Sequence, residues 1–200
     1  MDWVNGMVRK IATWLVYIVG LIPVPLFLYL AQTGGLGREP IKALEHELGE
    51  LALKLLIVGL AITPLRKLVG LNLIKFRRAI GVLTFTYVAL HLLVWLVLDV
   101  QVLSQIWADI LKRPYITIGM LGFVMMIPLV ITSNNWSVKR LGAGWRRLHQ
   151  LTYLVAILGG IHFIMIAKGI QLEPLIYMAV ILGLLAYRLP AIRKSFQKTC

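Results

Sequence analysis

Four histidines are the residues of this sequence with the widest chemical repertoire: His46, His91, His149 and His162. Imidazole binds metal ions and exchanges protons near neutral pH. His91 and His162 stand inside long apolar runs, and His149 stands at the start of one. Ionisable side chains are costly at membrane depth and face the interior of a helix bundle, so each of these histidines is a functional candidate.

The single cysteine, Cys200, limits the metal chemistry. One thiol forms no disulfide framework and no thiolate metal site, and the sequence has no Cys-x-x-Cys-His segment for covalent haem attachment. His46 lacks the second histidine of the zinc motif His-Glu-x-x-His. We interpret its surroundings as a polar turn at the membrane surface, formed by Glu45-His46-Glu47-Leu48-Gly49-Glu50.

The elements that must position these histidines are apolar helices. Hydrophobic residues make up 60% of the 200 residues and charged residues 14%, which excludes an ordinary water-soluble domain. Continuous apolar runs near twenty residues long favour spanning helices over barrel strands, which alternate over about ten residues. The sequence predicts an all-α, polytopic membrane bundle of about six transmembrane helices in one domain. The runs are Ile11–Ala31, Leu48–Pro64, Ala79–Leu98, Tyr115–Thr132, Leu148–Ala167 and Leu175–Leu189.

The first apolar run imitates a signal peptide, because Arg9 and Lys10 precede it. No small-residue cleavage site follows, so we expect the first transmembrane helix there instead. Pro23 and Pro25 predict a kink in that helix, and Pro128 predicts one in the fourth. Neighbouring helices in a membrane tolerate such kinks.

Lys and Arg residues predict the orientation. Fifteen of them lie at the N-terminus, in the second and fourth connections and in the C-terminal tail, against five in the other three connections. The positive-inside rule then places both termini in the cytoplasm. The net charge of +13 therefore describes a cytoplasmic membrane face in contact with anionic lipids. No fold for binding nucleic acid accompanies it.

The depth of two histidines can be compared, because the third and fifth predicted helices both run outward. His91 lies about twelve residues into its helix and His162 about fourteen, so each is about 18 to 21 Å deep. Two imidazoles at one level on different helices suit axial ligation of a haem iron from both sides. Gly81, Gly159 and Gly160 are candidates for admitting the flat ring, although small residues also permit close helix packing.

His149 differs from that pair. It lies thirteen residues before His162, about 20 Å along an ideal helix and near the cytoplasmic surface. Thirteen steps of 100° leave the two side chains about 140° apart, so both face one interior only if the helix distorts or His149 lies on a frayed first turn. We expect it to act independently, as a ligand of a second haem or in receiving electrons. A structural role is the remaining possibility.

Several segments resemble a known family. Those around the histidines are similar to ferric-reductase-type transmembrane domains: Leu90-His91, Arg146-Arg147-Leu148-His149-Gln150-Leu151-Thr152-Tyr153 and Ile161-His162. More narrowly, three segments resemble the MsrQ (YedZ) family, the haem-binding membrane subunits of bacterial MsrPQ systems: Gly34-Gly35-Leu36-Gly37-Arg38-Glu39-Pro40, Ile62-Thr63-Pro64-Leu65-Arg66 and Arg113-Pro114-Tyr115-Ile116-Thr117. The resemblance covers nearly the whole chain and implies a single ferric-reductase-like transmembrane domain over residues 1–200.

That resemblance implies a b-type haem protein of the bacterial inner membrane. It would pass electrons from the quinone pool, or from a cytoplasmic flavin reductase, to a periplasmic MsrP-like molybdopterin enzyme that reduces methionine sulfoxide in oxidised proteins. His91, His149 and His162 match the family's haem histidines. FMN is also implied, although no motif identifies an FMN or quinone site. We expect a non-catalytic subunit that receives electrons from another molecule, since no G-x-G-x-x-G domain follows the last helix.

Two other functions stay open on the residues alone. A transporter or proton channel would use buried histidines as relays, without a porphyrin. Purified protein with no Soret band after haem supply would favour that function, and a bis-histidine spectrum would favour the electron carrier. A membrane scaffold would only anchor a reductase, and it would not need two histidines at matched depth.

Overall fold

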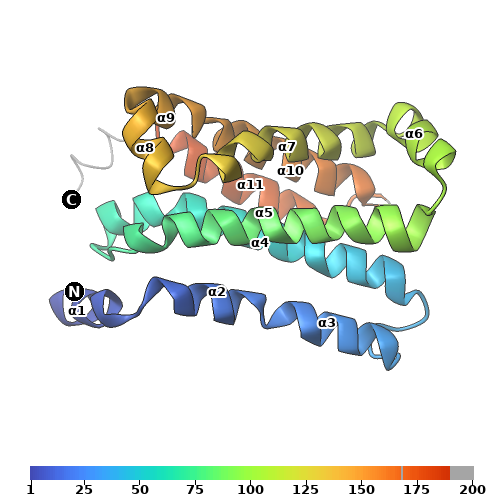
Figure 1. The fold of residues 1–200 in the computed structure, drawn as a ribbon, viewed down its shortest axis with the longest axis horizontal. Helices are drawn as coiled ribbons and strands as arrows, with labels where there is room; N and C mark the ends of the chain where they lie inside the picture. Colours follow the sequence, from blue (N-terminus) through green and yellow to red (C-terminus); the bar gives the residue numbers. More distant parts are fainter. Residues whose placement is uncertain (168, 190–200) are drawn as a thin grey trace.

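A computed structural model of the chain describes residues 1–167 and 169–189, which form an elongated bundle of helices (Figure 1). All regular structure in these residues is helical, so the all-α prediction is confirmed. Five helices are long and apolar enough to cross a membrane: Thr13–Gln32, Pro40–Leu68, Ile74–Val100, Pro114–Ile131 and Ala143–Ile166. A sixth apolar helix, Leu172–Ala186, has 15 residues, fewer than the roughly twenty that span a bilayer.

The helices follow the predicted apolar runs with modest shifts, and α7, α10 and α11 agree with their runs to within three residues at each end. Four short helices, α1, η1, α6 and α8, lie outside the runs, and α9 overlaps a run only at Leu148. In chain order the helices are α1 (Asp2–Lys10), α2 (Thr13–Leu21), α3 (Pro23–Gln32), α4 (Pro40–Leu68), η1 (Ile74–Phe76), α5 (Arg77–Val94), the π-helical η2 (Trp95–Val100), α6 (Leu103–Lys112), α7 (Pro114–Ile131), α8 (Asn135–Leu141), α9 (Ala143–Leu148), α10 (Leu151–Ile166) and α11 (Leu172–Ala186).

The first predicted helix is divided in two at Pro23. The proline ring removes an N–H donor and interrupts the helical ladder, so α2 ends at Leu21 and α3 begins at Pro23. The fully buried Tyr87 of α5 donates from its hydroxyl to the carbonyl of Gly20, at 2.6 Å. This bond satisfies one of the carbonyls that the last turn of a helix leaves unpaired. By contrast, α7 continues through Pro128.

The polar segment around His46 is helical, so the predicted turn is wrong. α4 begins at Pro40, a residue whose fixed φ suits the first turn of a helix, and runs for 29 residues. Leu44, Leu48 and Ala52 recur every four residues and are buried. The polar residues between them occupy the other faces of the same helix, which an apolar-run criterion does not detect.

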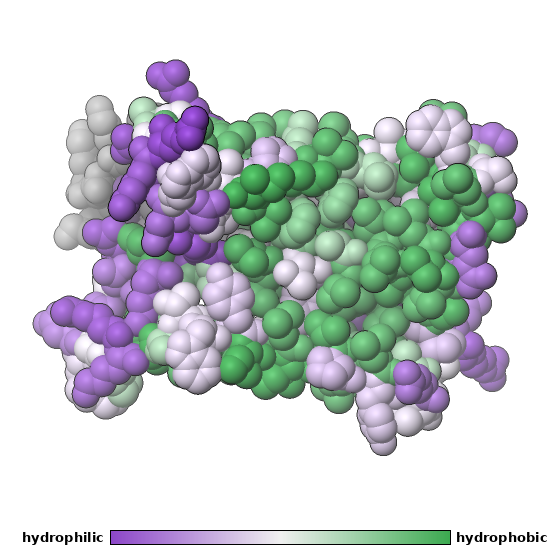
Figure 2. Space-filling view, in the orientation of Figure 1, coloured by the Kyte–Doolittle hydropathy of each residue, from purple (hydrophilic) through white to green (hydrophobic). Residues whose placement is uncertain are grey.

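The centre of the bundle lies around α4. Its most extensive contacts are with α5, while α7 packs along α10. One buried cluster joins α4 to α5 through Leu44, Leu48, Ala52, Tyr87 and Val94. A second joins α4 to α10 and α11 through Leu53, Leu60, Ala156 and Ile181. Figure 2 shows apolar side chains in a broad belt across the face in view and hydrophilic ones at the two ends of the bundle, as a bilayer requires.

The two ends of the bundle differ in charge. The end that carries α1, α8 and α9 (Figure 1) is rich in Lys and Arg. The opposite end, formed by the start of α4, by η2 and by α6, carries most of the acidic residues. Of the basic C-terminal tail, Arg188 is described, whereas Arg193, Lys194 and Lys198 lie outside the described residues.

Candidate functional site

The structure brings His91 and His162 together inside the bundle. His91 lies near the end of α5 and His162 near the end of α10. Their ring centres are 6.2 Å apart, and the two ring planes are nearly perpendicular, at 87°. The juxtaposition expected from the depth comparison is therefore present, while the role of the two rings as metal ligands stays a prediction.

Each of these imidazoles is fixed through its Nδ1 atom. His91 Nδ1 lies 2.8 Å from the carbonyl oxygen of Glu45, and His162 Nδ1 lies 2.7 Å from that of Tyr115. A carbonyl only accepts, so each Nδ1 carries a proton and donates it. In the neutral ring this leaves the lone pair on Nε2, which is the arrangement that metal-ligating histidines use.

A cavity of about 650 Å³ adjoins the two rings, a size typical of sites for small molecules and cofactors. Its walls come from α4, α5, α7 and α10 and are mostly apolar, with Leu53, Val88, Phe123, Met126 and Val155 among them. Five charged side chains also line it, most of them at the end of the bundle where α4 begins: Lys42, Glu45, Glu50, Asp99 and Arg113. The cavity therefore combines an apolar body with a charged rim.

Of the three glycines considered for admitting a flat ring, Gly159 lines the cavity. Gly160 faces α11 instead, because a Cβ there would stand 2.7 Å from Cε of Met178. Gly81 is exposed, and no atom lies within 4 Å of the place its Cβ would take. The expectation is wrong for Gly81, and Gly160 serves helix packing.

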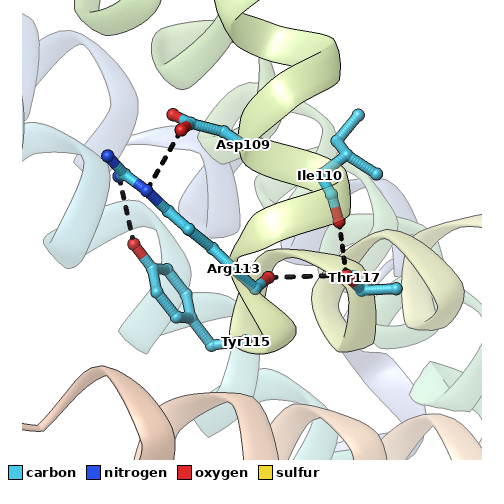
Figure 3. A network of polar contacts seen from close by, with 5 residues as sticks. All are labelled: Asp109, Ile110, Arg113, Tyr115 and Thr117. Carbon is cyan, nitrogen blue, oxygen red and sulfur yellow. Dashed lines mark hydrogen bonds and ion pairs between the residues drawn. The ribbon is translucent and has the colours of Figure 1, made fainter.

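A polar network fixes the start of α7 beside His162 (Figure 3). Arg113 Nε pairs with Asp109 Oδ1 at 3.1 Å, and Arg113 Nη1 donates to the Tyr115 hydroxyl at 3.3 Å. Thr117 Oγ1 donates to a carbonyl of α6 at 2.5 Å. These contacts tie the end of α6 to the first turn of α7, which holds the Tyr115 carbonyl that accepts from His162.

His149 lies at the other end of α10. It occupies the turn between α9 and α10, which agrees with the alternative of an irregular first turn. Its ring stacks on Trp145, with centres 3.9 Å apart. From Leu151 to His162 the helix rises about 16 Å, so His149 and His162 cannot share one metal.

The hydrogen bonds of His149 indicate a different tautomer from that of His91 and His162. Its Nε2 lies 3.0 Å from Thr132 Oγ1. The Thr132 hydroxyl donates to the carbonyl of Pro128 at 2.6 Å. Because a hydroxyl has one hydrogen, His149 Nε2 is the donor to Oγ1. A metal could bind at this Nε2 only after that bond is given up.

The donor set fits a porphyrin iron better than a bare metal ion. Among residues 1–167 and 169–189, no group of three or more His, Cys, Asp or Glu side chains could hold a metal ion. Structural zinc takes four protein ligands, whereas the iron of a haem takes four nitrogens from the macrocycle and only axial ligands from the protein. Two facing imidazoles beside an apolar cavity meet that need.

The chain, a multi-pass membrane bundle with two facing histidines beside an apolar cavity, is of the ferric reductase class, because residues 48–160 match the family described as ferric reductase like transmembrane component. Within this class, the chain belongs to the MsrQ family. No solved structure matches the chain.

Three similar relatives share one name, protein-methionine-sulfoxide reductase heme-binding subunit MsrQ. The relative from Agrobacterium fabrum is 51% identical over 179 residues, which cover 89% of this chain and 83% of the relative. Those from Brucella anthropi and Brucella ovis are each 45% identical over 177 residues, covering 88% of this chain and 80% of the relative. The similarity therefore extends over most of both chains.

Proposed function

We propose that this chain is a haem-binding electron-transfer subunit of a protein-methionine-sulfoxide reductase system, with His91 and His162 as axial ligands of one haem b. The names of the relatives supply the haem and the reductase. The observation on this chain that carries the proposal is the separation of the two imidazole centres, 6.2 Å. With metal–nitrogen bonds of about 2 Å, two imidazoles on opposite sides of one iron have centres about 6 Å apart.

The cavity supports the same proposal. Its apolar walls suit the porphyrin ring. Lys42 and Arg113 also line it, and they could bind the two carboxylates of haem b through charge-assisted hydrogen bonds if they exchanged or shared their present partners, Glu39 and Asp109. A bound haem would take up and release one electron at a time. The protein residues would orient the ring, keep water away from it and, through the Glu45 and Tyr115 carbonyls, set the basicity of the two ligating Nε2 atoms.

The orientation of the bundle supports a route across the inner membrane. By the positive-inside rule, the basic end with α1, α8 and α9 faces the cytoplasm, together with both termini. His91, His162 and the charged rim then lie toward the periplasm, where an MsrP-like molybdopterin reductase would accept electrons. The quinone pool or a cytoplasmic flavin reductase would supply them.

His149 belongs to the proposal as a separate group at the cytoplasmic end. It either ligates a second haem, after release of Thr132, or assists the entry of electrons. The family resemblance also implies FMN, but no group of described residues identifies a place for it. We therefore assign no residue to FMN or to a quinone.

The experiment that tests the proposal is an anaerobic reduced-minus-oxidised spectrum of the purified protein, with pyridine-haemochrome quantitation. We expect a low-spin bis-histidine b-type spectrum and at least one haem per chain. Protein that shows no Soret band after ample haem supply would contradict the proposal and favour a histidine relay for protons.

A further inference from the structure

Two helices present the same arrangement to the two histidines of the pair. His91 donates to the Glu45 carbonyl of α4, and four residues later α4 has Gly49. His162 donates to the Tyr115 carbonyl of α7, and four residues later α7 has Gly119. In an α-helix a carbonyl accepts from the N–H four residues ahead. Each imidazole therefore shares its carbonyl with the N–H of a glycine.

Each of these glycines is in contact with the ring. A Cβ added to Gly49 would stand 3.0 Å from Nδ1 and 3.2 Å from Cε1 of His91. A Cβ added to Gly119 would stand 2.9 Å from both Nδ1 and Cε1 of His162. Non-bonded atoms normally approach to about 3.5–4.0 Å. The imidazoles thus lie over the helix backbone in the space that any other residue would fill with its side chain.

Neither ring can move away from its glycine without weakening its hydrogen bond or changing its distance from the other imidazole. The hydrogen bonds from Nδ1 are already 2.7 and 2.8 Å long, and a shift away from the glycine lengthens them. Each ring also has the other imidazole as a neighbour, at 6.2 Å between centres. An added methyl group would therefore turn the ring, stretch its hydrogen bond or change the separation of the pair.

We propose that Gly49 and Gly119 are positioning residues for the two haem ligands. By lacking a side chain, each lets one imidazole lie on the helix and donate from Nδ1 to the carbonyl four residues earlier. Together they fix the two ring planes nearly at right angles. This inference rests on the proposed function, because it concerns the ligands of the proposed haem.

At the other helical glycines an added Cβ would not meet a histidine ring. This difference separates ring positioning from general helix packing. On α4, a Cβ at Gly59 would lie 3.6 Å from Ile80 Cγ2, an ordinary distance. On α5, Gly81 has no atom within 4 Å of its Cβ position. Gly59→Ala and Gly81→Ala are therefore matched controls for Gly49→Ala and Gly119→Ala.

The angle between axial imidazole planes has a spectroscopic signature. Perpendicular planes make two iron d orbitals nearly equal in energy, so low-spin ferric haem gives an EPR signal dominated by one large g value. Parallel planes give a rhombic signal instead. The hydrogen bond to Nδ1 makes the imidazole a stronger electron donor, which stabilises ferric haem and lowers the midpoint potential. Both quantities report on the ligand and not on overall folding.

The test compares the four alanine variants with the unchanged protein, all full length, purified and haem-loaded. For the unchanged protein and both controls we expect the same large-g signal and the same midpoint potential of the bis-histidine haem. Gly49→Ala and Gly119→Ala should each move the g value and raise the potential. If a variant loses haem, haem and free imidazole are added to it. Recovery of a low-spin spectrum, in a variant that unfolds at the same temperature as the unchanged protein, supports a displaced ligand.

Two results would overturn the inference. In the first, Gly49→Ala and Gly119→Ala retain haem with the unchanged g value and potential, or the controls shift equally. In the second, haem is lost and imidazole restores no low-spin spectrum. Either result leaves the proposed function standing. An absence of haem from the unchanged protein would instead contradict the proposed function itself.

Discussion

At the scale of single residues, the state of an imidazole depends on which neighbour takes its proton. His91 and His162 donate from Nδ1 to carbonyls, whereas His149 donates from Nε2 to Thr132. The first arrangement exposes a ligating nitrogen, and the second occupies it. Three histidines in apolar surroundings therefore differ in their readiness to bind iron.

We expect His91→Ala and His162→Ala each to remove or convert the same low-spin haem signal, because one iron is proposed to need both rings. The double variant should resemble either single variant. Low-temperature EPR and pyridine-haemochrome quantitation measure the effect, and Leu121→Ala, at an exposed position of α7 that does not line the cavity, is the control. Separate signals lost in the two variants would show that the histidines do not share an iron.

His149→Ala should leave the bis-histidine signal intact, because about 16 Å of α10 separates this residue's turn from His162. If His149 ligates a second haem, His149→Ala should have a lower haem content. If His149 assists the entry of electrons, the variant should keep its full haem content and be reduced more slowly by quinol or reduced flavin. Haem quantitation and stopped-flow reduction distinguish the two. Loss of the bis-histidine signal would contradict the separation of the two ends.

Much of the site follows from the sequence, and part of it does not. His91 and His162 are found by their depth in two apolar runs, because helix rise converts residue number into distance. Their contacts with Gly49 and Gly119 depend on how α4 and α7 are rotated about their axes. That rotation is set by packing between helices, which residue spacing along one helix does not encode.

At the scale of elements, a proline in one helix is compensated by an arginine from another. Pro64 lies inside α4 and has no N–H for the Leu60 carbonyl. Arg188, just after α11, donates from Nη2 to that carbonyl at 2.8 Å and from Nη1 to the Tyr153 hydroxyl at 3.2 Å. One side chain thereby connects α11 to both α4 and α10.

Arg188→Leu should destabilise the bundle, because the Leu60 carbonyl loses its donor. Hydrogen bonds to charged groups contribute about 1.5–3 kcal/mol each, so we expect a clear fall in Tm in detergent. Arg146→Gln, at an exposed position of α9, is the matched control and should unfold like the unchanged protein. Equal Tm values for all three proteins would refute the connecting role.

The sequence predicts the long apolar helices better than the short amphipathic ones. Long apolar runs identify α7, α10 and α11 because nearly every residue in them is apolar. The short helix α6 needs a different criterion, since Leu103, Trp107 and Leu111 recur every four residues and are exposed. A helical period is visible there, but the run is interrupted by polar residues and so falls below a hydropathy threshold.

At the scale of the whole molecule, the two ends of the bundle differ in charge. The hydrophilic side chains gather at the ends of the apolar belt (Figure 2), and the basic ones favour the end with α8 and α9. We expect reporters fused after Lys198 to be active only as cytoplasmic reporters. Reporters inserted between Gln101 and Ile110 should be active only as periplasmic ones. The opposite pattern would place the histidine pair on the cytoplasmic side.

The position of His91 and His162 near the acidic end has an electrical consequence. Under the proposed function, an electron that reached them from the basic end would cross much of the bilayer, and one charge crossing all of it in a potential of 100 mV exchanges about 2.3 kcal/mol. With the cytoplasm negative, the field would drive this electron outward, so the transfer would discharge the membrane. Electrons entering near the acidic end would cross almost none of the field. In proteoliposomes of uniform orientation, a valinomycin potential should therefore change the rate of haem reduction only if electrons enter at the basic end.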